Sequence, residues 1–371
     1  MNEQVPIWSP RSITRLGPPS SQPLQAVVAV PARNEVERLP KTLAALDAQK
    51  DIDPAATGVV VLLNNCTDGT LEAVRAMNSI LRMSVWAVEI ELAPAFANAG
   101  WARRAAMEYA AGLVAPGGVI LTTDADTIPD PDWISQVLAA FADGVDAVAG
   151  YVTADWDELC KLPAAVLERG AIEWEYQNLA VETESRADPR PHDPWPRHNQ
   201  NCGANAAITL ESYRAIGGLP PEPVGEDRAM FNEVRLRDGK IRHSLRAHVV
   251  TSARTEGRAF GGMADALRLR DDPGYPCDDL LETALQTLRR NRTRAKMRRS
   301  WEAAGGARPR PVPQAAGFED AEAPRSFGEL WSLAERENPA LARVPLTSRN
   351  MRGELEKMRR LVARLRKLRS P

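Results

Sequence analysis

The chain has 371 residues, and its 47 basic and 49 acidic side chains leave a formal net charge of −2. One large α/β domain with an appendage, or two modest domains, would fit this length, because single cores stop growing beyond roughly 250–300 residues. The balanced charge gives no overall field that favours nucleic acid, so we expect no nucleic-acid partner.

Cysteine spacing and hydropathy indicate whether the protein is secreted, membrane-bound or cytoplasmic. The four cysteines stand far apart, without the CxxC pairs of a zinc site or the framework of a disulfide-rich domain. The N-terminal segment lacks the apolar core of a signal peptide, and no run approaches the ~20 apolar residues of a membrane span. We therefore expect a soluble, cytoplasmic protein.

Residues 1–23 are rich in Pro and Ser without periodicity, and we expect them to form a flexible N-terminal segment. Beyond them, apolar runs alternate with helical patterns. The expected pairs of strand and helix are 25–31 with 37–49, 58–63 with 70–81, 85–92 with 100–113, and 119–123 with 132–142. This alternation is typical of βαβ units, so we predict an α/β fold with a mostly parallel central sheet flanked by helices.

The pattern becomes less regular in the second half of the chain. The further expected elements are a strand at 147–151, a helix at 159–181, a strand at 204–210, a helix at 228–238 and a strand at 246–252. Segment 182–201 holds four prolines and cannot be regular. Its His192, Trp195 and His198 suit an acceptor loop, and a linker is the alternative.

We expect a main domain over 24–262 and a helical, basic C-terminal region over 263–371, with a Gly/Pro-rich linker near 303–324. In the segment 354–369, apolar residues recur at helical spacing and basic residues cover the other face. We favour packing of this amphipathic helix against the main domain or a partner helix. Peripheral contact with the inner face of the membrane is the alternative.

Two carboxylates follow the buried run 119–123. Alternation along an extended chain places Asp124 and Asp126 on the same side, where both can approach one cation. Mg²⁺ or Mn²⁺ held by one or two carboxylates keeps positions open for substrate phosphates. The D-x-D pattern occurs three more times, at 51–53, 130–132 and 155–157, but none of these follows a buried strand.

Polar residues also follow other predicted strands. The segments PARNE at 31–35 and NNCTDGT at 64–70 each stand at a strand end, with ordinary loop chemistry as the alternative. Asn205 lies in a small-residue strand of the kind that lets a ligand approach the backbone. Asp227 opens a helix, as a cap or as a general base that deprotonates an acceptor hydroxyl.

Taken in order, these segments resemble family 2 glycosyltransferases of the GT-A fold over roughly residues 24–262. The matching motifs are VPARNE at 30–35, NNCTDGT at 64–70, NAGWARR at 98–104, DAD at 124–126, GAN at 203–205, GGLP at 217–220 and GED at 225–227. The ordered set is far more specific than any one motif.

The resemblance implies a role for each motif. Pro31, Arg33, Glu35 and Asn65 would surround the base and ribose of a nucleotide-diphosphate sugar. In the DAD motif, Asp124 and Asp126 would hold the sugar, the metal and the diphosphate. In the GED motif, Asp227 would be the base of an inverting displacement. Glu226 beside it and Asn205 of the GAN motif would lie on the side of the acceptor, an unknown carbohydrate or small molecule.

Two departures from the family pattern affect these assignments. Asn64 and Asn65 replace the usual Asp-Asp, so the nucleotide is open. Trp101 replaces a usual Lys, and Arg103 or Arg104 could supply the missing positive charge to the diphosphate, with a solvated helix face as the alternative.

A Gly-flanked loop after the last expected strand carries two arginines, Arg254 and Arg258, which suit bidentate contacts with the donor diphosphate. His248 is a candidate third metal ligand, with a structural role as the alternative.

The leading hypothesis is thus a metal-dependent, inverting glycosyltransferase. The alternatives are a retaining GT-A enzyme similar to those that glycosylate phosphoglycerate, in which Asp227 is not the base, and a non-catalytic GT-A binding scaffold. A binding scaffold has no need of the carboxylates in both DAD and GED, which argues against it.

Overall fold

The computed structural model describes residues 8–20, 22–257, 261–272, 274–278, 280–306 and 323–368. It divides the chain into two compact units. The first unit consists of Met1–Cys160, Gln200–Val234 and Lys240–Ala266, and the second of Lys161–Asn199, Arg235–Gly239 and Leu267–Pro371. The main domain was expected to span residues 24–262. In the structure, the segment 161–199 belongs instead to the second unit, with the C-terminal helices.

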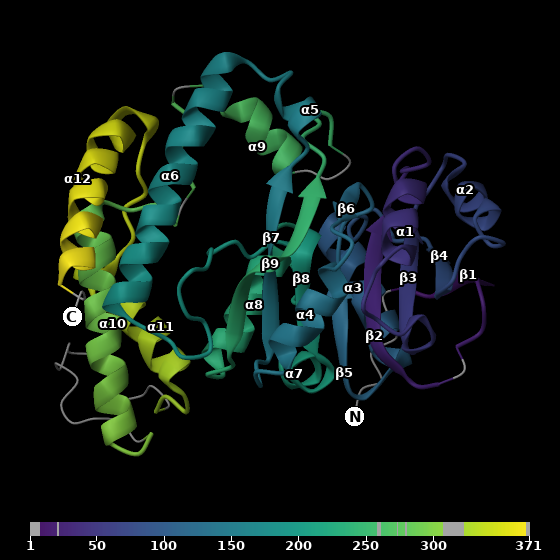
Figure 1. Cartoon of the computed structure of the whole chain (residues 1–371), viewed down its shortest axis with the longest axis horizontal. Helices are drawn as coiled ribbons and strands as arrows, with labels where there is room; N and C mark the ends of the chain where they lie inside the picture. Colours follow the sequence, from purple (N-terminus) through teal and green to yellow (C-terminus); the bar gives the residue numbers. More distant parts are fainter. Residues whose placement is uncertain are drawn as a thin grey trace. The chain divides into compact units, whose positions relative to one another are not determined.

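A mixed sheet of the order β1-β4-β3-β2-β5-β8-β7-β9-β6 forms the frame of the first unit (Figure 1). Its strands are β1 Pro10–Leu16, β2 Leu24–Ala32, β3 Thr57–Asn64, β4 Ser84–Ile90, β5 Val114–Thr122, β6 Thr127–Pro129, β7 Ala147–Ala154, β8 Ala206–Thr209 and β9 Ile241–Thr251. Strand β2 pairs in parallel with β3 and β5, and β3 pairs in parallel with β4. Strand β8 is antiparallel to both β5 and β7. The predicted α/β class is confirmed, with parallel pairing concentrated in the first half.

The helices of this unit cover both faces of the sheet. They are α1 Leu39–Asp47, α2 Thr70–Ala76, α3 Ala99–Leu113, α4 Trp133–Phe141, α5 Trp156–Leu159, α7 Leu210–Ala215 and α8 Glu226–Leu236, followed by α9 Met263–Leu269 where the two units divide. Helices α1, α3, α4 and α8 lie within two residues of their predicted bounds, whereas α2 ends five residues before its predicted end and no bounds were predicted for α5, α7 and α9. The continuous apolar run of β2 is explained by this cover, because strands buried on both faces need no polar side.

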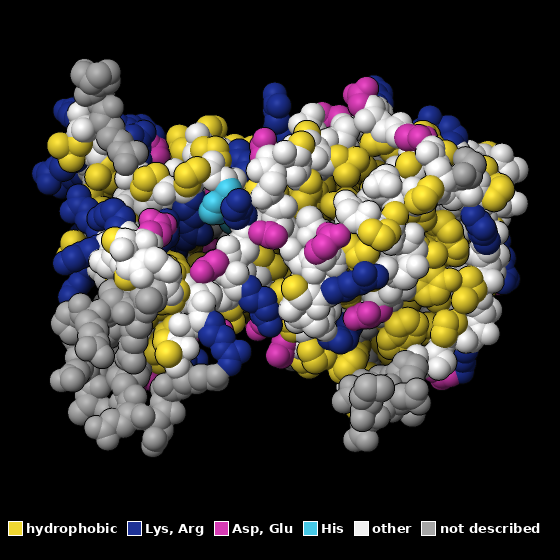
Figure 2. Space-filling model, turned by 90° about the horizontal axis from the view of Figure 1, so that it is seen from below, with side chains coloured by type: hydrophobic (Ala, Val, Ile, Leu, Met, Phe, Trp, Pro, Cys, Tyr) yellow, Lys and Arg dark blue, Asp and Glu magenta, His cyan; other side chains and the backbone are white. Residues whose placement is uncertain are grey.

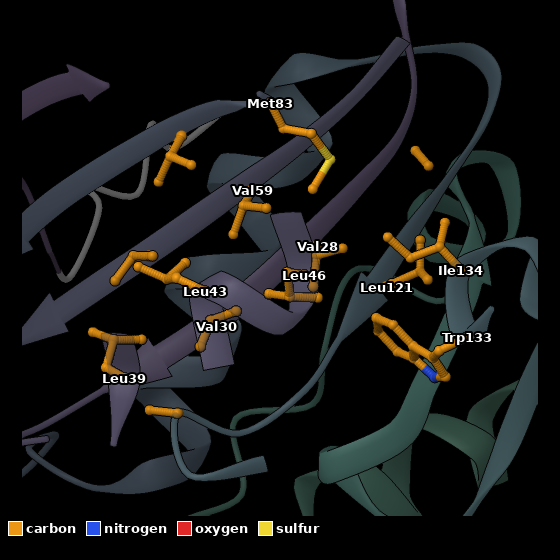
Figure 3. Close-up of a cluster of buried hydrophobic side chains, with 14 of the residues drawn as sticks. Val28, Val30, Leu39, Leu43, Leu46, Val59, Met83, Leu121, Trp133 and Ile134 are labelled. Atoms are coloured by element: carbon orange, nitrogen blue, oxygen red, sulfur yellow. The ribbon is translucent and has the colours of Figure 1, made fainter. Parts of the chain in front are cut away.

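Successive residues of β2 enter two different cores. Val28 and Val30 point into a cluster with the side chains of α1 and α4, which Figure 3 shows around Leu43 and Trp133. Val27 lies in the second cluster, on the face covered by α3. The period-2 alternation of a strand thus fills both cores at once.

The N-terminal segment differs from the expectation. Residues 10–16 form strand β1, which pairs antiparallel with β4 at the edge of the sheet, and Leu16 is buried. An edge strand tolerates Pro10 because one of its sides needs no partner for the backbone. The Pro- and Ser-rich surroundings conceal this short strand in the sequence.

The second unit is helical. Its helices are α6 Ala164–Ala187, α10 Ala284–Ala303, α11 Phe327–Glu337 and α12 Ser348–Lys367. Helix α6 extends six residues beyond its predicted end, because Arg186 pairs with Glu182 one turn earlier and supports the last turns. Residues 307–322, most of the expected linker, lie outside the described residues.

Helix α12 buries the apolar face that the sequence predicts. Met358 and Val362 are almost inaccessible and pack with Tyr176 of α6 in one cluster. Packing of this helix against other helices is therefore confirmed. Its other face is basic, and Figure 2 shows Lys and Arg side chains on the surface of this unit. No helix among the described residues is long and apolar enough to cross a membrane.

Candidate active site

The site forms at the edge of the sheet where β2 and β5 end. Because these two strands are parallel, the residues that follow them meet at one edge, and the Thr123 amide donates to the carbonyl of Ala29. Glu35 follows β2, and Asp124 and Asp126 follow β5. The side chain of Asp124 is 35% exposed and that of Asp126 is 15% exposed. The structure thus brings together the residues expected to hold donor and metal.

Arg103 is the central cation of this edge. It lies in α3, which begins after Asn98, whose side chain accepts a hydrogen bond from the Trp101 amide. Its guanidinium is buried and donates to Asp124 Oδ1 at 2.6 Å and to Glu226 Oε1 at 3.0 Å. It also donates to the Thr122 hydroxyl and to the Gly203 carbonyl, each at 2.9 Å. Burial alone would lower the pKa of Arg103, but the charges of Asp124 and Glu226 outweigh burial and raise it.

The contacts of Arg103 are with the protein itself. Its N–H groups bond four acceptors, and these bonds hold the site together. The neighbouring Arg104 donates to the backbone carbonyls of Gly217 and Leu219 and anchors the GGLP segment.

Close packing around Arg103 depends on glycine. A Cβ atom at Gly203 would lie within 2.6 Å of the Arg103 Nη2 atom, so no larger residue fits without displacing the guanidinium. Gly203 opens the 3₁₀ turn Gly203–Asn205. The sequence suggested that the small residues of the GAN motif let a ligand approach the backbone. In the structure, it is the guanidinium of Arg103 that lies close to the backbone of Gly203.

Glu226 and Asp227 open helix α8 and differ in environment. Glu226 is buried, and burial raises its pKa while the Arg103 charge opposes this shift. Asp227 is partly exposed; its Oδ2 accepts from the Gly203 amide at 2.7 Å and its Oδ1 from the Arg228 amide at 2.6 Å. Glu226, expected on the acceptor side, is a buried partner of Arg103 in this structure. Asp227 keeps an accessible carboxylate.

Arg254 connects two of the donor-side residues. Its Nη2 lies 2.5 Å from Glu35 Oε1 and 3.1 Å from Asp126 Oδ2. Burial and the nearby charge of Asp124 raise the pKa of Asp126 to about 6, although Arg254 opposes the shift. The expected neighbour Arg258 lies outside the described residues.

Glu158 is a residue of this region that sequence analysis missed. Its Oε1 accepts from Arg38 at 2.8 Å, and its Oε2 accepts from the Ser252 hydroxyl at 2.6 Å and the Ala253 amide at 2.8 Å. These bonds lower the pKa of Glu158 against the opposing effect of burial. It fixes the start of the loop that carries Arg254. No motif marks it, because its partners lie far away in the sequence.

The donor set at the DAD motif suits a hard divalent cation only in part. Among the described residues, no group of three or more His, Cys, Asp and Glu side chains could hold a metal. Asp124 and Asp126 could supply two carboxylates, and Mg²⁺ or Mn²⁺ commonly takes its other ligands from substrate phosphates and water. His248 does not complete the set, because its ring nitrogens contact Asp130 at 2.9 Å and Thr153 at 2.8 Å.

Two of the other predicted residues have structural partners. Asn65 adopts a positive φ of 48°, and its side chain bonds both the amide and the carbonyl of Leu92. Asn205 is 1% exposed; it accepts from the Trp133 indole and donates to two backbone carbonyls. Asn205 therefore connects the strands on which these carbonyls lie with the indole of Trp133. Arg33 is exposed and Pro31 is half-buried, beside the carboxyl end of β2.

Residues 27–159 match the family model described as "Glycosyl transferase family 2", the family that the motifs led us to expect. A comparison with curated proteins gives no significant match. The family match covers β2 to α5, with Glu35, Arg103, Asp124 and Asp126 inside it, and ends before Glu226 and Asp227.

Many solved structures resemble the chain at low identity. TarS 1-349 of S. aureus with UDP is 16% identical at a TM-score of 0.44, over 62% of this chain and 61% of that one, which is less than two thirds of its length. The mannosyltransferase PcManGT of Pyrobaculum calidifontis with GDP-Man and Mn²⁺ is 18% identical at 0.45, over 95% and 82% of the chains. The glucosyl-3-phosphoglycerate synthase of Mycobacterium tuberculosis with Mn²⁺, UDP and phosphoglyceric acid is 18% identical at 0.40, over 68% and 82%. TM-scores below 0.5 carry no argument about function.

Proposed function

We propose that the chain transfers a sugar from a nucleotide-diphosphate sugar to an acceptor hydroxyl, because residues 27–159 match the family model described as "Glycosyl transferase family 2". The observation that carries this proposal is the connection made by Arg103. One buried guanidinium bonds Asp124, which follows a central strand, and Glu226, which directly precedes the accessible carboxylate of Asp227. The two carboxylate motifs are thus held at one edge of the sheet, as a two-substrate transfer requires.

Asp227 is the proposed general base. Two backbone amides fix the orientation of its carboxylate, and each oxygen keeps a second lone-pair direction with which it can accept a proton. In an inverting transfer, Asp227 takes the proton of the acceptor hydroxyl as that oxygen attacks the anomeric carbon. The bond from this carbon to the diphosphate oxygen breaks, and the nucleoside diphosphate leaves.

Asp124 and Asp126 are the proposed ligands of Mg²⁺ or Mn²⁺. When bound, such a cation would neutralise the charge that develops on the departing diphosphate. The protein's own contribution is to orient the two carboxylates, Asp124 through Arg103 and Asp126 through Arg254. We further propose that Pro31, Arg33 and Glu35 border the nucleoside.

Calorimetric titration with UDP- and GDP-sugars in the presence of Mn²⁺ tests the donor site. We expect binding by the wild type and at least a tenfold loss in Asp126→Asn, because the second carboxylate is removed. Asp157→Asn is the matched control, since Asp157 is exposed and belongs to another D-x-D pattern. Equal binding by Asp126→Asn and Asp157→Asn would refute the metal-diphosphate role.

The stereochemistry of the product tests the role of Asp227. With the donor identified by calorimetry, proton NMR of the product should show an inverted anomeric configuration. Asp227→Asn should then keep donor binding but lose turnover, because the amide cannot accept the proton. A retained configuration would remove the general-base role and favour the retaining mechanism.

A further inference from the structure

The second unit contains a buried group of charged side chains, which we call the arginine cluster. It lies where α6 ends and the Pro-rich segment begins. Its members are Arg190, Arg197, Arg235, Arg294 and Arg298, with the carboxylates of Glu184, Asp188 and Asp193. Buried guanidinium groups are costly unless acceptors replace their lost hydration.

Arg197, Arg294 and Arg298 pair with the carboxylates of the arginine cluster. Asp188 accepts from Arg294 at 2.6 Å and from Arg298. Glu184 accepts from Arg294 at 2.7 Å and lies 3.4 Å from Arg197, which also pairs with Asp193. These bonds satisfy the best acceptors of the cluster.

Arg190 is left without such a bond. Its Nη2 lies 3.8 Å from Glu184 and 3.8 Å from Asp188, beyond hydrogen-bond distance, and its buried Nε has no acceptor among the described residues. The buried Nε of Arg197 has none either. The charge of Arg294, with burial, lowers the pKa of Arg190 to about 9. A buried N–H group without a hydrogen bond is expensive, because it loses its hydration and gains no partner.

We propose that Arg190, with the neighbouring Arg197, forms a binding site for a phosphate-type oxyanion, either free phosphate or a phosphate monoester. Such an anion offers several acceptor oxygens to Arg190 and Arg197, whose Nε groups have no acceptor among the described residues. The planar fork of arginine matches a phosphate in bidentate geometry. The Arg190 side chain is 20% exposed, so an anion can reach it from solvent.

This site goes beyond the proposed donor site. Its residues all belong to the second unit, and none of them contributes to the DAD or GED motifs. It also gives the Pro-rich segment a function that its sequence did not indicate. Arg190 and Arg197 stand in the segment in which the sequence suggested an acceptor loop.

Titration of the full chain with inorganic phosphate tests the proposal, by calorimetry and by thermal unfolding at constant ionic strength against NaCl. We expect a phosphate-specific rise in Tm for the wild type. Arg190→Gln should bind phosphate at least about tenfold more weakly, and Arg190→Lys should recover only part of the binding because it lacks the fork. Arg289→Gln is the matched control, since Arg289 is exposed and forms no ion pair among the described residues.

The same titrations with glycerol phosphate and with glycerol distinguish a phosphate monoester from free phosphate as the ligand. Tighter binding of glycerol phosphate assigns the site to a phosphorylated small molecule, and equal or weaker binding than phosphate assigns it to the free ion. The proposal is overturned if phosphate raises Tm no more than NaCl does, or if Arg190→Gln, shown by circular dichroism to be folded, binds phosphate as the wild type does. A phosphate response that Asp126→Asn loses and Arg190→Gln keeps would place the ion at the donor site and also overturn it.

Discussion

The guanidinium of Arg103 lies 2.6 Å from Asp124, and this contact fixes the first carboxylate of the DAD motif. Among the described residues only Oδ1 of Asp124 has a partner, so Oδ2 can face a cation or a sugar hydroxyl. Arg103 also pairs with buried Glu226, whose charge would otherwise lack a partner. A single residue of α3 therefore positions groups on both sides of the proposed transfer.

Replacement of Arg103 by Met should be severe for both stability and activity. The free energy of unfolding should fall by about 3–5 kcal/mol, because Glu226 is left buried and unpaired. Turnover should fall by about a hundredfold, since Asp124 loses its orientation. Urea unfolding and donor turnover measure the two effects. Arg33→Gln is the control for stability, since Arg33 is exposed; a similar loss of stability in both variants would contradict the buried role of Arg103.

A methyl group at Gly203 should act through the same arginine. Gly203→Ala places a Cβ against the guanidinium of Arg103, so we expect a loss of about 1–3 kcal/mol and reduced turnover. Gly112→Ala, in the same helix as Arg103, meets no atom within 4 Å and should be neutral or stabilising by about 0.5–1 kcal/mol. Thermal unfolding compares the two. Equal effects would show that the packing around Gly203 is not tight.

The fold could be predicted well where the pattern is local. The buried runs of β2, β3 and β5 and the helices between them follow from apolar periodicity, because each segment carries its own signal. Strand β1 and the last turns of α6 could not be predicted in this way. The first depends on pairing with β4 and the second on an ion pair at Arg186.

The site was predictable in location but not in detail. The strand-end rule places Asp124, Asp126 and Glu35 at one edge of a parallel sheet, as the structure has them. The rule cannot distinguish a residue that binds substrate from one that bonds other residues of the site. Arg103 and Asn205 match family motifs, yet both are buried and bond other side chains of the chain. That distinction depends on contacts between segments about a hundred residues apart, which no local pattern encodes.

Acid should destabilise the second unit through Glu184. Burial would raise the pKa of Glu184, but Arg197, Arg294 and Arg190 outweigh burial and hold this pKa well below its usual range. A depressed folded-state pKa means that the stabilisation is fully present above the unfolded value of about 4.3 and is lost as pH falls toward the folded value. Thermal unfolding between pH 7 and pH 3 should therefore show a falling Tm below about pH 4.3. Glu184→Gln should be less stable at pH 7 and show a weaker acid dependence; an unchanged acid slope would contradict this role.

The two faces of α12 should respond differently to substitution. Met358 is fully buried against α6, so Met358→Ala should cost about 2–5 kcal/mol of unfolding free energy. Arg360→Ala, on the exposed face, should change it by no more than about 0.5 kcal/mol. Any peripheral membrane contact must then use the basic face, because the apolar face is occupied. Co-sedimentation with anionic vesicles tests this: a double Arg360→Gln, Arg364→Gln variant should bind more weakly if the contact exists, and no binding by the wild type would exclude it.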